Sequence, residues 1–388
     1  MSYFIKFKKI SIILIATLLL PIFALSVGAS EKPNTPDMEF DCESVILMEA
    51  RTGTVLYEKN ADKALPPASV TKIMTLLLVM EEIEKGKMNY SDTIVASANA
   101  ASMGGSQIFL KEGEEMSALD LIKSVIIASA NDAAVALAEH VAGSETAFVA
   151  LMNERASELG MKNTNFENTN GLDDTTTNHV TSARDIAIMS RELIKHEDVL
   201  KYSSTWMDSV RGGAFGLTNT NRLVRFYQGI TGLKTGSTAK AKFCVSATAK
   251  RGNMHLICVV MGAPSSDVRN SIASQLLNYG FANYELFEDH AEPLDPIKIN
   301  MGVESRCNIQ SSDFYCVVPK GAANKMTKQY ILPESVNAPI STGDIIGRIE
   351  YKLNGKIMGA TSIFASNTVP KIDYWTLFSH ILSKFLLK

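Results

Sequence analysis

The chain has 388 residues, of which 46% are hydrophobic and 20% are charged, an ordinary balance for globular protein. This length allows two or three domains with sizeable cores. The formal net charge is only −3, so the chain lacks the basic field that attracts nucleic acid, and we expect no nucleic-acid partner.

The N-terminus has the form of a secretory signal. Lysines precede an almost wholly apolar run over residues 10–25, which ends at small residues. This pattern predicts a signal peptide over residues 1–29, followed by a polar linker over residues 30–40. An uncleaved membrane anchor is the alternative, and with either one the body of the protein lies outside the cytoplasm.

Cysteines and histidines are too scattered for a disulfide framework or a metal site. The chain has five cysteines without C-x-x-C spacing and six histidines without H-x-x-x-H spacing. We therefore expect no structural zinc, no cofactor and no catalytic histidine. Two pairs, Cys244 with Cys258 and Cys307 with Cys316, flank short segments and stay open to pairing across hairpins, with buried free thiols as the alternative.

The folded body is expected to open with a hairpin and a buried helix. β-prone runs at residues 44–48 and 54–57 flank a glycine turn. Two prolines then favour extended backbone, so a helix is predicted to begin at Ala68 or Ser69 and to end near Gly86. Its apolar sequence is typical of a helix buried in a core.

A serine and a lysine lie one turn apart at the start of this helix. The i, i+3 spacing places the Lys72 amine on the same face as the Ser69 hydroxyl. Backbone N–H groups of the first turn have no intrahelical partner and point toward a developing oxyanion. The pair indicates acyl transfer, although a serine N-cap beside a solvated lysine would have the same spacing.

Helices are predicted through the middle of the chain. Apolar periodicity indicates helices over residues 117–127, 131–141, 146–159 and 182–193, and turn-forming residues indicate a loop over residues 163–174. A small, partly polar tripeptide separates the first two helices.

Strands are predicted to follow. Residues 230–233 lead into a Lys-Thr-Gly motif, and residues 243–249 and 254–261 read as neighbouring strands of one sheet. An amphipathic helix over residues 268–279, ending at Gly280, is expected to close this unit.

The character of the chain changes after residue 287. Residues 288–299 read as an acidic connector, and short β-prone runs then follow with little helical periodicity. Residues 345–349 and 356–362 bracket an Asn-Gly pair, a strong signal for a type I′ hairpin. We therefore expect a small all-β domain, a sandwich or a barrel, over residues 288–366.

The helical spacing of apolar residues in the last segment, residues 370–388, predicts an amphipathic helix. It is too short to span a membrane, and we expect it to hold the secreted protein at the outer face of the cytoplasmic membrane. Packing against the β domain is the alternative. The apolar face and the flanking cations comprise Trp375, Phe378, Leu382 and Phe385, with Lys371, Lys384 and Lys388.

Three polar motifs in chain order support a catalytic interpretation of the serine and the lysine. The motifs resemble the S-x-x-K, S-x-N and K-T-G signatures of penicillin-recognising serine enzymes, and each lies in the expected context of helix start, interhelical loop or strand. They are Ser69-Val70-Thr71-Lys72, Ser129-Ala130-Asn131 and Lys234-Thr235-Gly236.

The similarity extends beyond these motifs. Residues 41–287 closely resemble the D-alanyl-D-alanine carboxypeptidases, the low-molecular-mass penicillin-binding proteins, and the β domain and terminal helix match that family's layout. The resemblance implies an α/β (α+β) DD-peptidase domain with an antiparallel sheet, followed by a small all-β domain. The stretches that carry it are residues 56–62, 67–75, 168–172, 181–185 and 232–236.

The resemblance also implies an activity and its catalytic groups. The expected enzyme is a serine-type carboxypeptidase that removes the terminal D-alanine from the peptidoglycan stem pentapeptide and is inhibited by β-lactam antibiotics. Ser69 is expected to attack the carbonyl between two D-alanines, and Lys72 to accept its proton. Ser129 is expected to relay a proton to the departing nitrogen, and Asn131 to orient Lys72 and the substrate amide.

The substrate's carboxylate end is assigned by the same resemblance. Lys234 and Thr235 are expected to bind the terminal carboxylate, and Gly236 to leave room for substrate along the strand. The N–H group of Ser237 would join that of the nucleophile in the oxyanion hole. Arg269 is a candidate second carboxylate ligand, with a solvated arginine as its alternative.

One departure and several alternatives stay open. Lys242 stands where the family usually has glycine, which puts close kinetic analogy in doubt.

A class A β-lactamase would use a glutamate to activate water, and Glu167 is the residue to test on that count. A catalytically idle binding protein and a transpeptidase are further alternatives, and Arg222 is a weaker candidate ligand than Arg269.

Overall fold

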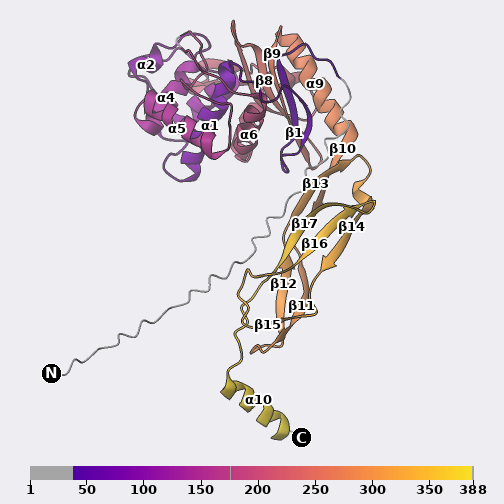
Figure 1. The fold of residues 1–388 in the computed structure, drawn as a ribbon. Coiled ribbons are helices and arrows are strands. Elements are labelled where there is room, and N and C mark those ends of the chain that lie inside the picture. Colours follow the sequence, from indigo (N-terminus) through magenta and orange to yellow (C-terminus); the bar gives the residue numbers. More distant parts are fainter. Residues whose placement is uncertain (1–37, 175, 387–388) are drawn as a thin grey trace, which may run out of the picture. The chain divides into compact units, whose positions relative to one another are not determined.

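A computed structural model describes residues 38–174 and 176–386 of the chain. The expected signal peptide, nearly all of the linker and Lys388 lie outside these residues. Figure 1 traces the fold and labels its elements.

A five-stranded antiparallel sheet forms the centre of the first domain. The predicted hairpin and the predicted pair of neighbouring strands both belong to it. In sheet order the strands are β2 (Val55–Lys59), β1 (Ser44–Glu49), β9 (Met254–Ala263), β8 (Lys242–Arg251) and β7 (Ile230–Thr238).

Helices cover both faces of this sheet (Figure 1). Side chains alternate between the two faces of a strand, so Val259 of β9 packs in one apolar cluster and Val260 in another. The first cluster includes Ile73 of α1, and the second includes Leu276 of α9. On the first side lie α1 (Lys72–Glu84), α4 (Asn131–Ala142), α5 (Glu145–Glu158) and α6 (Ala183–Leu193), and on the second side lies α9 (Ser266–Asn283).

The predicted end of the last helix at Gly280 is wrong. Helix α9 continues to Asn283, with Gly280 buried inside it. A Cβ atom at Gly280 would lie 2.6 Å from Cδ1 of Leu256 on β9. This glycine therefore allows the helix to pack closely on the sheet and does not terminate the helix.

The helix predicted over residues 117–127 is divided in the structure. It comprises α3 (Ala118–Lys123), capped by the Ser117 hydroxyl, and a π-helical turn over Ser124–Ala128. Shorter elements complete the domain: α2 (Ala98–Ala101), α7 (Glu197–Ser203), α8 (Leu223–Phe226), and the strand pairs β3 (Thr93–Val95) with β4 (Glu115–Ser117) and β5 (Met207–Val210) with β6 (Phe215–Thr218).

The second domain is built from strands, as predicted. The interpretation of residues 288–299 as a connector is wrong, because β10 (Tyr284–Asp289) and β11 (Pro293–Asn300) occupy most of them. The type I′ hairpin is confirmed by positive φ angles at Asn354 and Gly355, 51° and 81°. The other strands are β12 (Arg306–Ser311), β13 (Phe314–Pro319), β14 (Met326–Ile331), β15 (Ser335–Asn337), β16 (Ile345–Leu353) and β17 (Lys356–Ala365).

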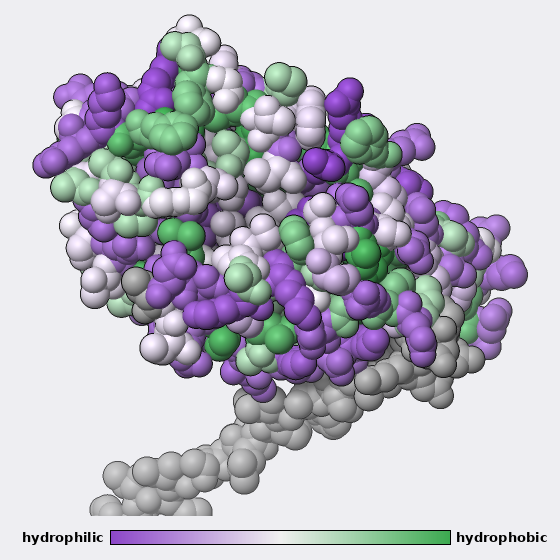
Figure 2. Space-filling view, turned by 90° about the horizontal axis from the view of Figure 1, so that it is seen from above, coloured by the Kyte–Doolittle hydropathy of each residue, from purple (hydrophilic) through white to green (hydrophobic). Residues whose placement is uncertain are grey.

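Helix α10 (Tyr374–Leu386) is the terminal helix that the sequence predicts. Its side chains Trp375 and Phe378 are 76% and 50% exposed, so the β domain does not cover them. On the face shown in Figure 2, by contrast, hydrophobic residues are scattered among hydrophilic ones. No single helix of the described residues is long and apolar enough to span a membrane, and only the bent pair α4 and α5 passes on length and composition.

Candidate active site

The first serine motif lies in a tight turn that precedes α1. Ala68–Thr71 forms a 3-10 turn, and the α-helix begins only at Lys72. Ala68 has a left-handed φ of 50°, and its carbonyl accepts a hydrogen bond of 2.8 Å from the Thr71 hydroxyl. A Cβ atom at Gly171 would lie 1.9 Å from that carbonyl oxygen, so the 163–174 loop presses directly on the turn. A hydrogen bond within the turn and the loop packed on it therefore hold the turn in place.

Lys72 is fully buried and makes three short contacts through Nζ. Its partners are Ser69 Oγ at 2.9 Å, Asn131 Oδ1 at 2.5 Å and the Asn170 carbonyl at 2.7 Å. Burial and the nearby cation Lys234 hold the pKa of Lys72 well below its ordinary value, and Asp132 opposes them. A neutral amine is therefore favoured beside the serine hydroxyl.

The second motif is brought to the same place by an unusual backbone. Ser129 follows the π-helical turn with a left-handed φ of 62°, and Asn131 then begins α4. The Asn131 backbone N–H donates to the Ser106 carbonyl at 2.7 Å, and its side-chain amide donates to the Gly104 carbonyl at 2.7 Å. These bonds orient the Asn131 oxygen toward Lys72.

The third motif supplies a second buried lysine. Lys234 Nζ lies 2.7 Å from Ser129 Oγ and 2.8 Å from the Thr235 carbonyl. Burial, assisted by the charge of Arg269, lowers the pKa of Lys234 to about 7. Both lysines therefore contact the Ser129-Ala130-Asn131 motif, Lys72 through Asn131 and Lys234 through Ser129.

Gly236 lines the cleft and also has a structural role. A Cβ atom there would lie 2.8 Å from the Ser69 backbone nitrogen and 2.9 Å from the Pro67 oxygen. The space that this glycine leaves is occupied by the turn that contains Ser69. Gly236 therefore allows β7 to pass close to Ser69, where a larger residue would push the two apart.

A cleft of about 240 Å³ joins the motifs. All three contribute to it, and Lys72, Asn131 and Lys234 lie buried directly behind its wall. It is lined by Ser69, Ser106, Ser129, Thr220, Arg222, Thr235, Gly236, Ser237, Phe243, Ser266 and Arg269.

Arg269 is not a solvated arginine. It is 4% exposed, lines the cleft, and donates hydrogen bonds to Asn270 Oδ1 and to the Cys244 carbonyl. Burial lowers its pKa to about 10, and the charge of Arg222 acts in the same direction. Arg222 itself is exposed and also lines the cleft.

A buried histidine that sequence reasoning did not assign to the site supports the turn that contains Ser69. His179 Nδ1 accepts from the Glu167 backbone N–H at 2.9 Å, so Nε2 carries the proton and donates to Thr71 Oγ1 at 2.8 Å. Thr71 in turn donates to the carbonyl of Ala68. Burial lowers the pKa of His179 to about 4, which keeps this relay in its neutral form.

Two other charged residues lie outside the cleft. The Glu167 carboxylate accepts from the backbone N–H groups of Thr177 and Asn178 at 2.8 and 3.1 Å, and so fixes its own loop. Lys242 has a left-handed φ of 54° and its amine lies 3.3 Å from Glu43. Neither side chain lines the cleft, so Glu167 is not placed as the deacylating glutamate of a β-lactamase.

All five cysteines are free thiols in the structure, so the suggested pairings do not form. Among the described residues, no group of three or more His, Cys, Asp or Glu side chains is arranged to hold a metal ion.

Comparisons with known proteins agree with this geometry. The model of the D-alanyl-D-alanine carboxypeptidase family matches residues 29–265, and that of the penicillin-binding protein 5 C-terminal domain matches residues 285–371. The D-alanyl-D-alanine carboxypeptidase DacF of Bacillus subtilis is 39% identical over 377 residues, which cover 95% of this chain and 96% of the relative.

Solved structures show the same architecture. Penicillin-binding protein 5 from Haemophilus influenzae superposes with a TM-score of 0.78 at 32% identity, covering 87% of this chain and 99% of that one. Penicillin-binding protein D2 from Listeria monocytogenes in the ampicillin-bound form has a TM-score of 0.59 at 31% identity, and covers 63% of this chain and 100% of that one.

Proposed function

Since the chain belongs to the D-alanyl-D-alanine carboxypeptidase family and is a serine-type hydrolase, we propose that it removes the terminal D-alanine of peptidoglycan stem pentapeptides through an acyl-enzyme on Ser69. The observation that carries this proposal is the contact of 2.9 Å between Ser69 Oγ and Lys72 Nζ. A serine hydroxyl needs an adjacent base to become a nucleophile, and the buried lysine is in hydrogen-bond reach.

The hydrogen bonds of Lys72 favour its role as the base. Two of its three partners, Asn131 Oδ1 and the Asn170 carbonyl, can only accept hydrogen bonds. A neutral amine has two N–H groups, which these oxygens use, so its lone pair is directed at the Ser69 hydroxyl. Lys72 then takes the Ser69 proton as Oγ bonds to the carbonyl carbon between the two D-alanines.

The departing nitrogen needs that proton, and Ser129 is the relay. Its Oγ accepts from Lys234, which leaves its own O–H free to donate to the leaving D-alanine amine. The carbon–nitrogen bond breaks, the leaving amine gains the proton, and Lys72 restores the proton of Ser129. Water then hydrolyses the acyl-enzyme ester and releases Ser69.

The other end of the cleft holds the substrate's charge. Lys234 and Arg269 present donors to the terminal carboxylate, and Lys234 has a third N–H beyond the two bonds it makes in the protein. The Thr235 hydroxyl, which donates to Thr220 in the structure, would turn to the carboxylate when substrate binds. The backbone N–H groups of Ser69 and Ser237 are the donors assigned to the oxyanion. Penicillins are expected to acylate the same serine.

D-Alanine release from a pentapeptide ending in D-Ala-D-Ala is the direct test. We expect release by the wild type and essentially none by Ser69→Ala. The matched control is Ser271→Ala, an exposed serine on α9, which should retain wild-type activity. Full activity in Ser69→Ala would show that another residue is the nucleophile.

Transpeptidation is the second candidate, because a structural relative of this chain is the DD-transpeptidase of Streptomyces K15, at 27% identity and a TM-score of 0.58. The same acyl-enzyme would pass to an amine in place of water. Product analysis with an added amino acceptor separates the two, and a transpeptidase would give a new amide as the main product.

We also propose that the enzyme works outside the cytoplasm and is held at the membrane surface by α10. The exposed side chains of Trp375 and Phe378, joined by Leu382 at 46%, support an interfacial helix. Deleting residues 372–388 from the mature protein is expected to abolish binding to lipid vesicles while D-alanine release from a soluble peptide is unchanged. Undiminished vesicle binding would contradict the assignment.

A further inference from the structure

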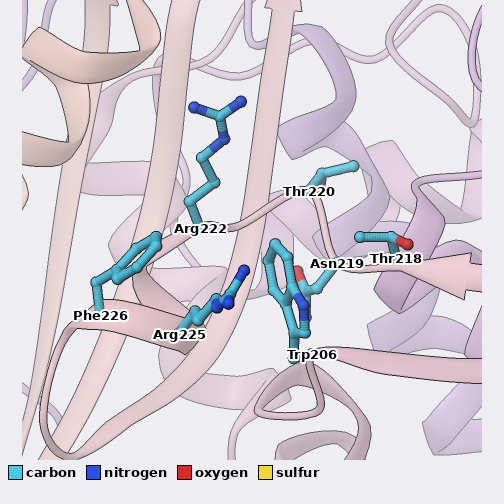
Figure 3. Close-up of a pocket in the computed structure, with 7 residues that line it drawn as sticks. All are labelled: Trp206, Thr218, Asn219, Thr220, Arg222, Arg225 and Phe226. Atoms are coloured by element: carbon cyan, nitrogen blue, oxygen red, sulfur yellow. The ribbon is translucent and has the colours of Figure 1, made fainter.

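A second cavity, of about 470 Å³, opens beside the catalytic cleft and falls within the size range of small-molecule sites. Thr220 and Arg222 line both the cavity and the cleft, so the two spaces lie next to each other. The cavity is lined by Trp206, Thr218, Asn219, Thr220, Arg222, Arg225 and Phe226 (Figure 3).

The cavity adjoins the end of the cleft that is assigned to the substrate carboxylate. Thr235, next to Lys234 on β7, donates to the Thr220 hydroxyl at 2.7 Å. Arg222 and Arg269 both line the cleft, and Arg222 also lines the cavity. A substrate whose carboxylate lies between Lys234 and Arg269 therefore has its leaving residue next to this cavity.

The loop between the two spaces is rigidly supported. Asn219 is buried, and its amide donates to the carbonyls of Ser203 and Thr205 at 3.1 and 2.8 Å. Asn221 is also buried and donates to the Gly232 carbonyl at 3.1 Å. Thr220, between these anchors, therefore has a fixed position, as a preformed site requires.

The charge of the cavity is positive and unneutralised. Its lining contains two arginines and no carboxylate. Arg225 lies 5.6 Å from the ring centroids of both Trp206 and Phe226, and in Figure 3 its guanidinium points toward the Trp206 ring. Within the described part of the chain, no ion pair to Arg222 or Arg225 occurs, and the carboxylate of nearby Asp208 is bonded to Lys123 at 2.7 Å.

From this geometry, and resting on the proposed function, we propose that the cavity is a leaving-group subsite for an acidic side chain. The enzyme would accept peptides whose last residue is D-glutamate or D-aspartate in addition to D-alanine. Arg225 binds the side-chain carboxylate, and the Trp206 ring packs on the methylene groups. The chemistry is unchanged: the same amide bond breaks, and the acidic D-amino acid leaves with the proton that D-alanine would take.

Paired peptides test this subsite by charge alone. The experiment compares kcat/KM for acyl-D-Ala-D-Glu and acyl-D-Ala-D-Gln, which have nearly the same shape. Hydrolysis of acyl-D-Ala-D-Ala verifies that each protein retains carboxypeptidase activity. The wild type is expected to prefer D-Glu over D-Gln by about tenfold, a typical effect of one charge-assisted hydrogen bond. Arg225→Gln should abolish this preference, Arg225→Lys should keep part of it, and both should hydrolyse D-Ala-D-Ala normally.

Binding to the inactive Ser69→Ala protein makes the test independent of turnover. Calorimetry with the D-Glu and D-Gln peptides should show the same tenfold preference, lost in the Ser69→Ala/Arg225→Gln double variant. Arg348→Gln, which changes an exposed arginine of the β domain, is the matched control and should leave the preference intact.

The outcomes separate the two proposals. Absence of D-Ala-D-Ala hydrolysis with a retained D-Glu binding preference would overturn the proposed function and leave the subsite standing. Equal binding of the D-Glu and D-Gln peptides would overturn the subsite. Tight binding of free D-glutamate without a preference between the peptides would also overturn it, because the anion would then bind apart from the leaving group.

Discussion

Polar groups in the wall of the catalytic cleft differ from those at its edge in burial and in hydrogen bonding. The inner wall, formed by Lys72, Ser129, Asn131 and Lys234, is buried, and each side chain has short hydrogen bonds within the protein. The rim, formed by Arg222 and by Arg225 of the adjacent cavity, is solvent-accessible, and neither arginine has an ion pair among the described residues.

This difference indicates a division of labour. Burial lowers the pKa values of Lys72 and Lys234 in the inner wall. Burying polar groups costs stability unless every polar atom is satisfied. Groups of the rim are exposed and remain available to ligands. Chemistry should therefore depend on the wall, and substrate choice on the rim.

Lys72→Met should have the largest effect. The substitution keeps the side-chain volume but removes the base, and we expect kcat/KM for a D-Ala-D-Ala peptide to fall by about a thousandfold or more. Loss of the amine also leaves the Asn131 oxygen and the Asn170 carbonyl without their donor. Circular dichroism should show that the protein still folds. A fall of less than tenfold would exclude Lys72 as the base.

His179 tests whether the wall extends beyond the motifs. The pKa of this residue is about 4 in the folded protein and about 6.5 when unfolded, so the unfolded state binds more protons between these values. Its contribution to stability is therefore present above about pH 6.5 and is lost as the pH falls toward 4. The free energy of unfolding should fall by about 2 kcal/mol from this cause between pH 7 and pH 5.

Urea unfolding of the wild type and His179→Gln at both pH values isolates this contribution. The variant should be less stable at pH 7 and should lack this share of the pH dependence. It should also acylate more slowly, because the Ala68 turn loses the support it receives through Thr71. Identical pH dependence in the two proteins would contradict the role of His179.

Lys234 gives a pH dependence of activity with a defined sign. Its pKa is lowered to about 7, so its charge is present below pH 7 and is lost as the pH rises. Binding of the substrate carboxylate should weaken accordingly, and kcat/KM should fall by about tenfold toward pH 9. Lys234→Arg keeps the charge and should remove this alkaline decline, whatever its effect on the maximal rate. A decline that persists in Lys234→Arg would assign it to another group.

Lys242→Gly should have the smallest effect, because Lys242 lies outside both the wall and the rim of the cleft. Lysine has a left-handed backbone at this position, and its ion pair with Glu43 is exposed and therefore weak. Glycine should raise the free energy of unfolding by up to about 1 kcal/mol with little change in kcat/KM. A large change in kcat/KM would show that Lys242 reaches the substrate.

The sequence predicted those parts of the site that depend on local spacing. Ser69 and Lys72 share one turn, the K-T-G motif lies on a strand, and the motif order places the three together. The buried state of Arg269 and the support of Ala68 by His179 were not predictable, because these contacts join residues far apart in the chain. The His179 bond to Thr71, for example, spans 108 residues.

The errors in the fold have similar causes. Gly280 was expected to end a helix, but a glycine that allows close packing has the same local signature as one that terminates. Residues 288–299 are acidic and contain prolines, which indicated a connector. Pairing with strands β12 and β13 gives these residues a regular structure that their local sequence does not favour.

The central claim is an acyl-enzyme on Ser69, and mass spectrometry of the protein after incubation with benzylpenicillin tests it most directly. We predict a single stable adduct on the peptide that contains Ser69, absent in Ser69→Ala. An adduct on a different residue, or rapid turnover of the penicillin without any adduct, would contradict the account.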